Sequence, residues 1–265
     1  MKKQTAVVGH PISHSLSPLL HNAIFKNEDI DAEMTAFDVT NIAQFVALMR
    51  STPLRLTAVT LPHKQTIMSL VDEIDATARE IGAVNTVINR EGKLVGYNTD
   101  IVGIAAALWD VELQGKNVLI IGAGGAARPL AHHLREKGAK IFCHGREYEK
   151  AQQLCECYGG EALRSADEFK EHAFDVVVNA TPLGLKVSDP LPFPTELIKP
   201  GMTVFDLNYV STTFLKEAAA KGVPTISGLP MFLAQGLEQE RLWLGREIPD
   251  QGYTALLLEE LERRK

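Results

Sequence analysis

The chain has 265 residues, and a typical length of roughly 150 residues per domain predicts two domains rather than one. Its 27 Lys and Arg and 33 Asp and Glu give a formal net charge of −6 without a basic cluster, which disfavours nucleic-acid binding. A hydrophobic share of 45% excludes disordered and fibrous classes. The apolar stretches are too short for a membrane span or a secretory signal. Three cysteines indicate a reduced, cytoplasmic protein, and neither cysteine nor histidine spacing suits a metal site. We expect Cys155 and Cys157 to lie on a helix surface.

Short apolar runs alternate with helical patterns through the first hundred residues, which predicts βαβ units and a mostly parallel sheet. We expect strands at residues 5–9, 56–60, 84–89 and 94–96. We expect helices at residues 18–26, 42–49, 64–70 and 76–81. Glu91-Gly92 joins the last two strands as a tight hairpin turn.

The second half of the chain repeats this alternation. Residues 117–121 form a continuous apolar run, as expected of a strand covered on both faces. We expect further strands at 140–144, 175–179, 203–206 and 224–227. We expect helices at 126–137, 147–158, 213–221, 231–244 and 253–264. The predicted fold is α/β, with two lobes, the second of which begins after residues 110–115.

A glycine-rich turn follows the predicted strand at 117–121. Gly122 permits a tight strand-to-helix turn, and Gly124 lets the backbone approach a pyrophosphate. The next helix directs its N–H groups at that anion. Gly125 and Ala126 complete the turn, and Ala127 stands where the dinucleotide fingerprint has its third glycine or an alanine. The context predicts dinucleotide binding, with a structural turn or another nucleotide-like ligand as the alternative.

Cofactor choice is predicted from the end of the next strand. Arg146 is able to pair with a 2′-phosphate, which favours NADP. Glu147 could accept hydrogen bonds from a ribose hydroxyl, which leaves NAD open, or it could simply begin the following helix.

Polar residues gather at predicted strand ends and helix starts in the first domain. Ser15 and Ser17 place two hydroxyls on a loop entering a helix. Lys64 falls in a predicted first helical turn, where its charge opposes the helix dipole. Asp100 ends a strand segment and begins a helix. Ordinary N-caps and a solvated surface charge would also explain these residues, whereas a lysine beside an aspartate suits proton transfer.

A series of motifs in one order makes the whole chain resemble the shikimate dehydrogenase family. The motifs are GHPISHSLSPLLHN at 9–22, VTLPHK at 59–64, GAVNTV at 82–87, GYNTD at 96–100, GAGGAA at 122–127, NATPLG at 179–184 and GLPMFLAQG at 228–236. The resemblance implies a reversible, NADP-dependent reduction of 3-dehydroshikimate to shikimate, a step of aromatic amino-acid biosynthesis. It implies two α/β domains, with residues 1–100 as a substrate and catalytic domain, completed by C-terminal helices 236–265, and residues 101–235 as a Rossmann-type dinucleotide-binding domain.

The resemblance also implies roles for individual residues. Lys64 and Asp100 would form the catalytic pair. The implied substrate-binding residues are Ser15, Ser17, Thr60, Asn85, Asp100, Tyr209 and Gln235. The implied cofactor-binding residues are Gly122, Gly124, Gly125, Ala126, Arg146, Thr181 and Gly228.

The sequence departs from the family at three places. Gly145-Arg146-Glu147 replaces the frequent Asn-Arg-Thr, Ala58 replaces an asparagine, and Pro230 interrupts the segment before Gln235. The first two keep an NAD-preferring quinate/shikimate dehydrogenase as the alternative. A non-catalytic dinucleotide sensor and a methyltransferase explain the motif series less well. We expect a small-molecule substrate, no nucleic-acid, membrane or metal partner, and a monomer or homodimer.

Overall fold

The chain folds into two compact units, which consist of Met1–Val102 with Leu233–Lys265, and of Gly103–Phe232. The computed structural model describes residues 2–186 and 188–264. The chain leaves the first unit within α4 (Asp100–Ala107) and returns to it within α8 (Leu229–Leu244). Gln235 therefore belongs to the first unit, whereas the expected boundary assigns it to the second. The contiguous helix α8 contributes to both units, so the division falls within a helix.

The first unit is built on a six-stranded sheet with the order β2-β1-β3-β5-β6-β4. Its strands are β1 (Lys3–Gly9), β2 (Ala32–Asp38), β3 (Leu54–Val59), β4 (Glu73–Ile74), β5 (Thr86–Arg90) and β6 (Lys93–Tyr97). β1 runs parallel to β2 and β3, and β4 runs parallel to β6, but β5 is antiparallel to both of its neighbours. The predicted hairpin is confirmed, since Glu91 and Gly92 adopt positive φ angles of 56° and 95°.

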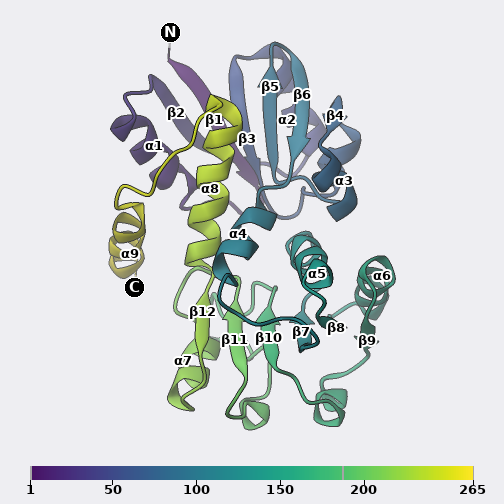
Figure 1. Cartoon of the computed structure of the whole chain (residues 1–265). Coiled ribbons are helices and arrows are strands. Elements are labelled where there is room, and N and C mark those ends of the chain that lie inside the picture. The colour runs from purple at the N-terminus through teal and green to yellow at the C-terminus, as the bar shows by residue number, and fades with distance from the viewer. Residues whose placement is uncertain (1, 187, 265) are drawn as a thin grey trace. The chain divides into compact units, whose positions relative to one another are not determined.

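Helices cover both faces of this sheet (Figure 1). The helices of the unit besides α4 and α8 are α1 (Ser17–Asn27), α2 (Ile42–Ser51), α3 (Ala76–Ile81) and α9 (Tyr253–Arg263). Phe25 of α1 and Leu242 of α8 pack on one face of the sheet, and Phe45 of α2 packs on the other. This enclosure explains why the sheet's apolar residues are buried on both sides.

The predicted helix at residues 64–70 is wrong. Only a short 3₁₀ helix, η1 (Thr66–Ser69), forms there, and Lys64 lies in the turn before it. The Lys64 carbonyl accepts a hydrogen bond of 2.8 Å from the Val84 amide, so this tertiary contact uses the acceptor that a helix would need. The sequence patterns also omit β2 and β4.

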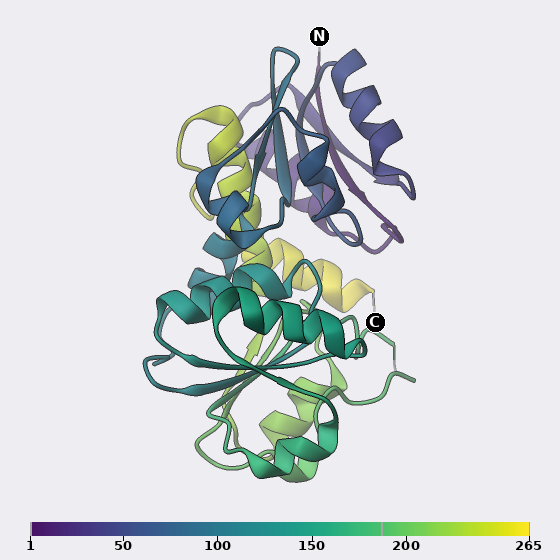
Figure 2. The same ribbon diagram turned by 90° about the vertical axis from the view of Figure 1, so that its right-hand side faces the viewer.

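The second unit contains a wholly parallel six-stranded sheet with the order β12-β11-β10-β7-β8-β9. Its strands are β7 (Asn117–Ile121), β8 (Lys140–His144), β9 (Glu161–Leu163), β10 (Val176–Asn179), β11 (Thr203–Asp206) and β12 (Thr225–Ser227). Its helices are α5 (Ala127–Glu136), α6 (Tyr148–Tyr158) and α7 (Thr213–Ala220), with 3₁₀ helices η2 (Ala166–Glu171) and η3 (Thr195–Leu197). Helices lie on both faces of the sheet (Figure 2), which confirms the Rossmann-type α/β prediction.

Cys155 and Cys157 lie on α6, but they do not share a surface. Cys155 is buried in the core of the second unit and only Cys157 is exposed, because residues two apart on a helix point in different directions. The expectation of a helix-surface pair is therefore wrong for Cys155.

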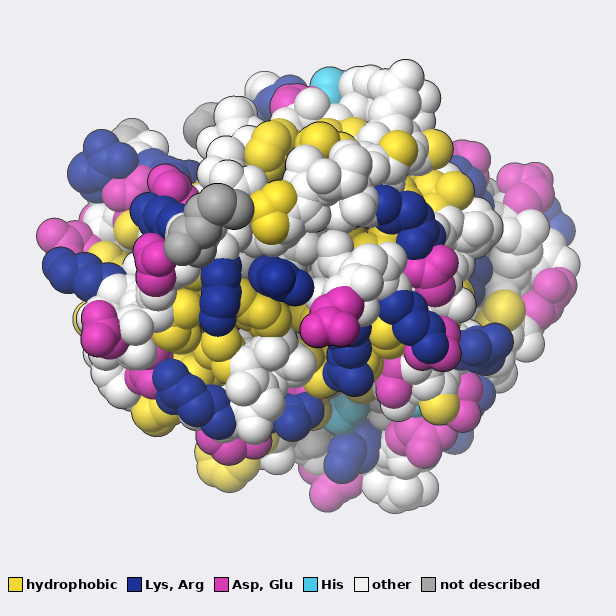
Figure 3. All heavy atoms as spheres, turned by 90° about the horizontal axis from the view of Figure 1, so that it is seen from above, with side chains coloured by type: hydrophobic (Ala, Val, Ile, Leu, Met, Phe, Trp, Pro, Cys, Tyr) yellow, Lys and Arg dark blue, Asp and Glu magenta, His cyan; other side chains and the backbone are white. Residues whose placement is uncertain are grey.

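The face shown in Figure 3 carries acidic and basic side chains interspersed with apolar ones. Across residues 2–186 and 188–264, no helix combines the length and the apolarity that crossing a membrane requires.

Candidate active site

Lys64 and Asp100 form an ion pair in the first unit. The Lys64 Nζ donates to Asp100 Oδ2 over 2.6 Å, and the two side chains are only 13% and 6% exposed. Asp100 is the first residue of α4, and its backbone N–H donates to the Asn98 side chain over 3.1 Å. A charge-assisted hydrogen bond shielded from water is stronger than an exposed one, so this pair fixes the direction of both side chains.

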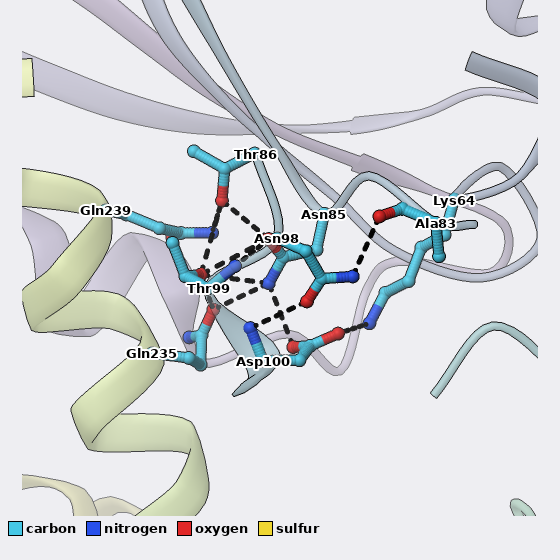
Figure 4. A network of polar contacts seen from close by, with 9 residues as sticks. All are labelled: Lys64, Ala83, Asn85, Thr86, Asn98, Thr99, Asp100, Gln235 and Gln239. Carbon is cyan, nitrogen blue, oxygen red and sulfur yellow. Dashed lines mark hydrogen bonds and ion pairs between the residues drawn. The ribbon is translucent and has the colours of Figure 1, made fainter. Parts of the chain in front are cut away.

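Asn85 orients the carboxylate of Asp100. Its Nδ2 donates to Asp100 Oδ1 and to Thr99 Oγ1, each over 2.9 Å. Its Oδ1 accepts from the Thr99 backbone N–H over 2.7 Å. Both carboxylate oxygens of Asp100 thus have a donor, one from Lys64 and one from Asn85 (Figure 4). The carboxylate cannot rotate without breaking one of these bonds.

Helix α8 brings two amide side chains to the same network. Gln235 Oε1 lies 3.5 Å from Asn85 Nδ2 and 3.4 Å from Thr99 Oγ1. Gln239, one helical turn further on, donates to Thr86 Oγ1 over 2.9 Å. Thr86, Thr99 and Gln239 were not among the predicted site residues. The i, i+4 spacing of the two glutamines was the available signal for Gln239.

The other predicted substrate residues of the first unit lie on separate elements. Ser17 begins α1 and is buried, and its N–H donates to Ser15 Oγ over 3.2 Å. Thr60 follows β3 and is half-buried, and its N–H donates to the Val8 carbonyl over 2.9 Å. The contacts therefore bring Lys64, Asn85, Asp100 and Gln235 together, while the three hydroxyl residues border other parts of the unit.

The glycine turn of the second unit has the shape that a dinucleotide requires. Gly122 has a φ of 113°, and a Cβ there would lie 2.8 Å from the Ala180 carbonyl oxygen. A Cβ at Gly124 would meet no atom within 4 Å among the described residues, so the backbone there borders open space. The adjoining helix α5 begins after Ala126, and no described side chain caps it. Its N-terminal N–H groups and dipole suit the pyrophosphate of a dinucleotide.

Glu147 precedes α6 and forms an ion pair of 2.8 Å with Lys150. The hydrogen bond from Lys150, then its charge, lowers the pKa of the Glu147 carboxyl. This geometry favours the interpretation in which Glu147 begins a helix. Arg146 beside it is exposed, and its guanidinium is available to a phosphate group.

Three further predicted residues lie on loops of the second unit. Thr181 follows β10, and its N–H and hydroxyl donate to Asn179 Oδ1 over 3.1 and 2.6 Å. The Tyr209 ring packs against the Phe232 ring at a centroid distance of 5.2 Å. A Cβ at Gly228 would lie 2.0 Å from the Leu207 carbonyl oxygen, so only glycine fits there.

A parallel sheet with a dinucleotide turn and a shielded lysine–carboxylate pair together define a nicotinamide-dependent oxidoreductase. Comparison with known proteins specifies the family. Residues 7–87 match the shikimate dehydrogenase substrate binding domain, and residues 104–186 match shikimate / quinate 5-dehydrogenase.

Relatives match along nearly the whole chain. The NADP(+) shikimate dehydrogenase of Aquifex aeolicus is 38% identical, with 92% of this chain and 91% of that protein aligned. The corresponding protein of Pyrococcus furiosus is also 38% identical, over 91% of this chain and 90% of its own. The crystal structure of the Thermus thermophilus enzyme with NADP(H) and shikimate has a TM-score of 0.86 and 35% identity, and 99% of each chain is covered.

The chain belongs to the shikimate dehydrogenase family. It is an NADP-dependent oxidoreductase that acts on a CH–OH group. The alternative of an NAD-preferring quinate/shikimate dehydrogenase has no better support, because these relatives are named for NADP(+).

Proposed function

We propose that Lys64 and Asp100 carry the proton transfer by which this chain interconverts 3-dehydroshikimate and shikimate. The observation that supports this most directly is the 2.6 Å pair between the two side chains, shielded from water and braced by Asn85. In this proposal the first unit supplies every substrate-binding residue except Tyr209, which comes from the second unit, and the second unit binds NADP. The reaction takes place in the cytoplasm.

Reduction of the ketone requires a hydride at carbon and a proton at oxygen. NADPH, when held by the glycine turn at Gly122 and Gly124, would supply the hydride, which is the chemistry of the nicotinamide itself. Lys64 Nζ donates the proton to the carbonyl oxygen, and in the reverse direction it accepts the proton from the hydroxyl. Asp100 holds the ammonium group through Oδ2 and remains fixed by Asn85 through Oδ1. A positioned acid of this kind contributes about 10²–10⁴-fold to the rate.

Polar groups, all of them neutral except Asp100, are proposed to recognise the rest of the substrate. Ser15 and Ser17 hold the carboxylate, and Asp100 accepts a hydrogen bond from a ring hydroxyl in addition to its part in proton transfer. The other groups proposed for the ring hydroxyls are Thr60, Asn85, Tyr209 and Gln235. A site with buried donors and acceptors strongly rejects analogues that lack a hydroxyl, because its own groups are then left unpaired.

The glycine turn is proposed to hold the pyrophosphate of the cofactor. The open space above Gly124 and the start of α5 support this assignment. Gly122, Gly125 and Ala126 shape the same turn. Thr181 and Gly228 contact the cofactor from neighbouring loops, and Arg146 pairs with the 2′-phosphate.

A four-way rate comparison tests the proposed function. Oxidation of shikimate or quinate is followed with NADP or NAD by the absorbance of the reduced nicotinamide. We expect the highest kcat/KM for shikimate with NADP. A higher kcat/KM for quinate than for shikimate would reject the proposed substrate. A higher kcat/KM with NAD than with NADP would reject the proposed cofactor.

A further inference from the structure

Asp206 is a buried carboxylate at the end of β11, and its side chain touches neither the Lys64 network nor the glycine turn in the contacts described above. It is fully shielded, with 0% exposure. Its Oδ1 accepts from Asn179 Nδ2 over 3.1 Å, from the Asn208 N–H over 3.0 Å and from Asn208 Nδ2 over 2.9 Å. Its Oδ2 accepts from Thr212 Oγ1 over 2.8 Å. All four donors are neutral.

Burial of this carboxylate is unfavourable by itself. It raises the pKa of Asp206, and the hydrogen bonds from Asn208, Thr212 and Asn179 oppose that rise. A carboxylate offers about four lone-pair sites, and four donors reach it here. Since an isolated buried charge is costly, the donors must be held around it for the fold to keep an acid at this position.

The first donor, Asn179, organises the loop after β10. Asn179 and Asp206 are register partners on adjacent parallel strands. The Asn179 Oδ1 accepts from both the N–H and the hydroxyl of Thr181. Its Nδ2 donates to the Leu183 carbonyl over 3.0 Å in addition to Asp206. The loop at 180–184 is therefore wrapped around a side chain that Asp206 orients.

The second donor, Asn208, links that loop to two others. Its Nδ2 donates to the Thr181 carbonyl over 3.0 Å as well as to Asp206. Its carbonyl accepts from the Gly228 N–H over 3.0 Å. The remaining donor, Thr212, caps α7 by accepting from the Leu215 N–H. Two segments of the second unit thus donate to one carboxylate, and the segment at Gly228 is tied to it through the Asn208 backbone.

We propose that Asp206 is a positioning residue for cofactor binding, which sets the loops bearing Thr181 and Gly228 through Asn179 and Asn208. This inference rests on the proposed function, which assigns cofactor contacts to Thr181 and Gly228. Asp206 itself touches no ligand. A substitution of Asp206 should therefore change the affinity for the cofactor first, and the proton-transfer step only as a consequence.

Two substitutions separate positioning from charge. Asp206→Asn keeps Oδ1 for its three donors, and its new amide is able to donate to the Thr212 hydroxyl, which has acceptor capacity left. Asp206→Ala removes every acceptor, so both asparagines lose their hydrogen bonds to this position and keep only those within the loops. Leu119→Ala is the matched control, because Leu119 is buried in the same sheet without contributing a side chain to these loops.

The test measures NADPH dissociation constants by fluorescence titration, with melting temperatures for every variant. We expect Asp206→Ala to raise the Kd at least tenfold, Asp206→Asn to stay within threefold of the original chain, and Leu119→Ala to lower Tm with unchanged Kd. An unchanged Kd in Asp206→Ala, or an equal rise in Leu119→Ala at equal loss of Tm, would overturn the proposal.

A third variant covers the case in which Asp206→Ala fails to fold. Asn208 is half-buried, and Asn208→Ala removes the side-chain bonds to Thr181 and Asp206 with little loss of core, while the backbone bond to Gly228 stays. We expect it to raise the Kd at least fivefold, and an unchanged Kd would overturn the proposal. If the original chain neither binds NADPH nor oxidises shikimate, the proposed function fails instead, and that outcome is recognised before any variant is compared.

Discussion

Replacement of Lys64 by methionine tests the central pair of the site. Methionine keeps a chain of similar length but removes the ammonium group that lies 2.6 Å from Asp100 Oδ2. Two effects follow from the geometry. The proton carrier is lost, and a carboxylate that is 6% exposed loses the cation with which it forms its ion pair.

The catalytic effect is expected to be large and confined to the chemical step. Loss of a positioned acid costs at least ~10²-fold in kcat. The affinity for NADPH should not change, because every residue proposed to hold NADPH belongs to the second unit. Steady-state kinetics and fluorescence titration of NADPH measure the two quantities separately.

The effect on stability can be bounded from burial. Breaking a buried ion pair by removing one partner costs ~3–5 kcal/mol. Asp100 keeps its hydrogen bond from Asn85, so we expect a loss near the lower end of that range, about 3 kcal/mol. Urea unfolding gives this free energy directly. The double variant Lys64→Met with Asp100→Asn should recover part of it, since no unpaired charge then remains.

The reasoning about Lys64 fails in either of two results. If Lys64→Met keeps more than a tenth of the original kcat, Lys64 is not the proton carrier. If the unfolding free energy of Lys64→Met equals that of the original chain, and the double variant is no more stable than Lys64→Met, then the ion pair is not shielded from water to the degree that its burial indicates.

Three further predictions concern the second unit. Arg146→Ala should raise KM for NADP at least tenfold and leave KM for NAD nearly unchanged, and equal effects on both would show that Arg146 does not select the 2′-phosphate. Gly122→Ala should weaken NADPH binding or lower Tm by several degrees, because the Cβ would lie 2.8 Å from the Ala180 carbonyl oxygen at a φ of 113°; unchanged values of both would contradict the turn geometry. Burial, assisted by the charges of Lys137 and His132, lowers the pKa of His133 from 6.5 to about 4. The fold therefore favours neutral His133. The free energy of unfolding that this residue contributes is complete above pH 6.5 and is lost as the pH falls towards 4. The loss is about 3 kcal/mol at most, and solvent screening reduces it. Urea unfolding across this range should show a smaller pH dependence in His133→Gln, and identical profiles would refute the assignment.

Local chemistry was enough to predict several elements. The strands at residues 117–121, 140–144 and 203–206 and the helix at 76–81 have the expected bounds. Continuous apolar runs and tight turns are encoded within a few residues, and so is the glycine turn before α5. The antiparallel direction of β5 relative to β6 follows from the hairpin at Glu91-Gly92, which the sequence also indicated.

Two of the errors have a common cause. Lys64 lies outside a helix because its carbonyl accepts from Val84, and Cys155 is buried because of the way α6 packs. In both cases a partner distant in sequence overrides the local pattern. The short strand β4, with only two residues, has too little sequence to produce a signal.

The sequence by itself determined which side chains are available for proton transfer, for anion binding and for hydroxyl recognition, and which turn follows which strand. Only the tertiary structure decided which of them meet. Asn85 and Gln235 are 150 positions apart, and their side-chain atoms lie 3.5 Å from each other. Asn179 ends β10 and Thr212 precedes α7, and both donate to Asp206. Hydrogen bonds form only between atoms a few ångströms apart in space. The separation of two residues along the chain does not predict that distance, which is set when the sheets and α8 pack.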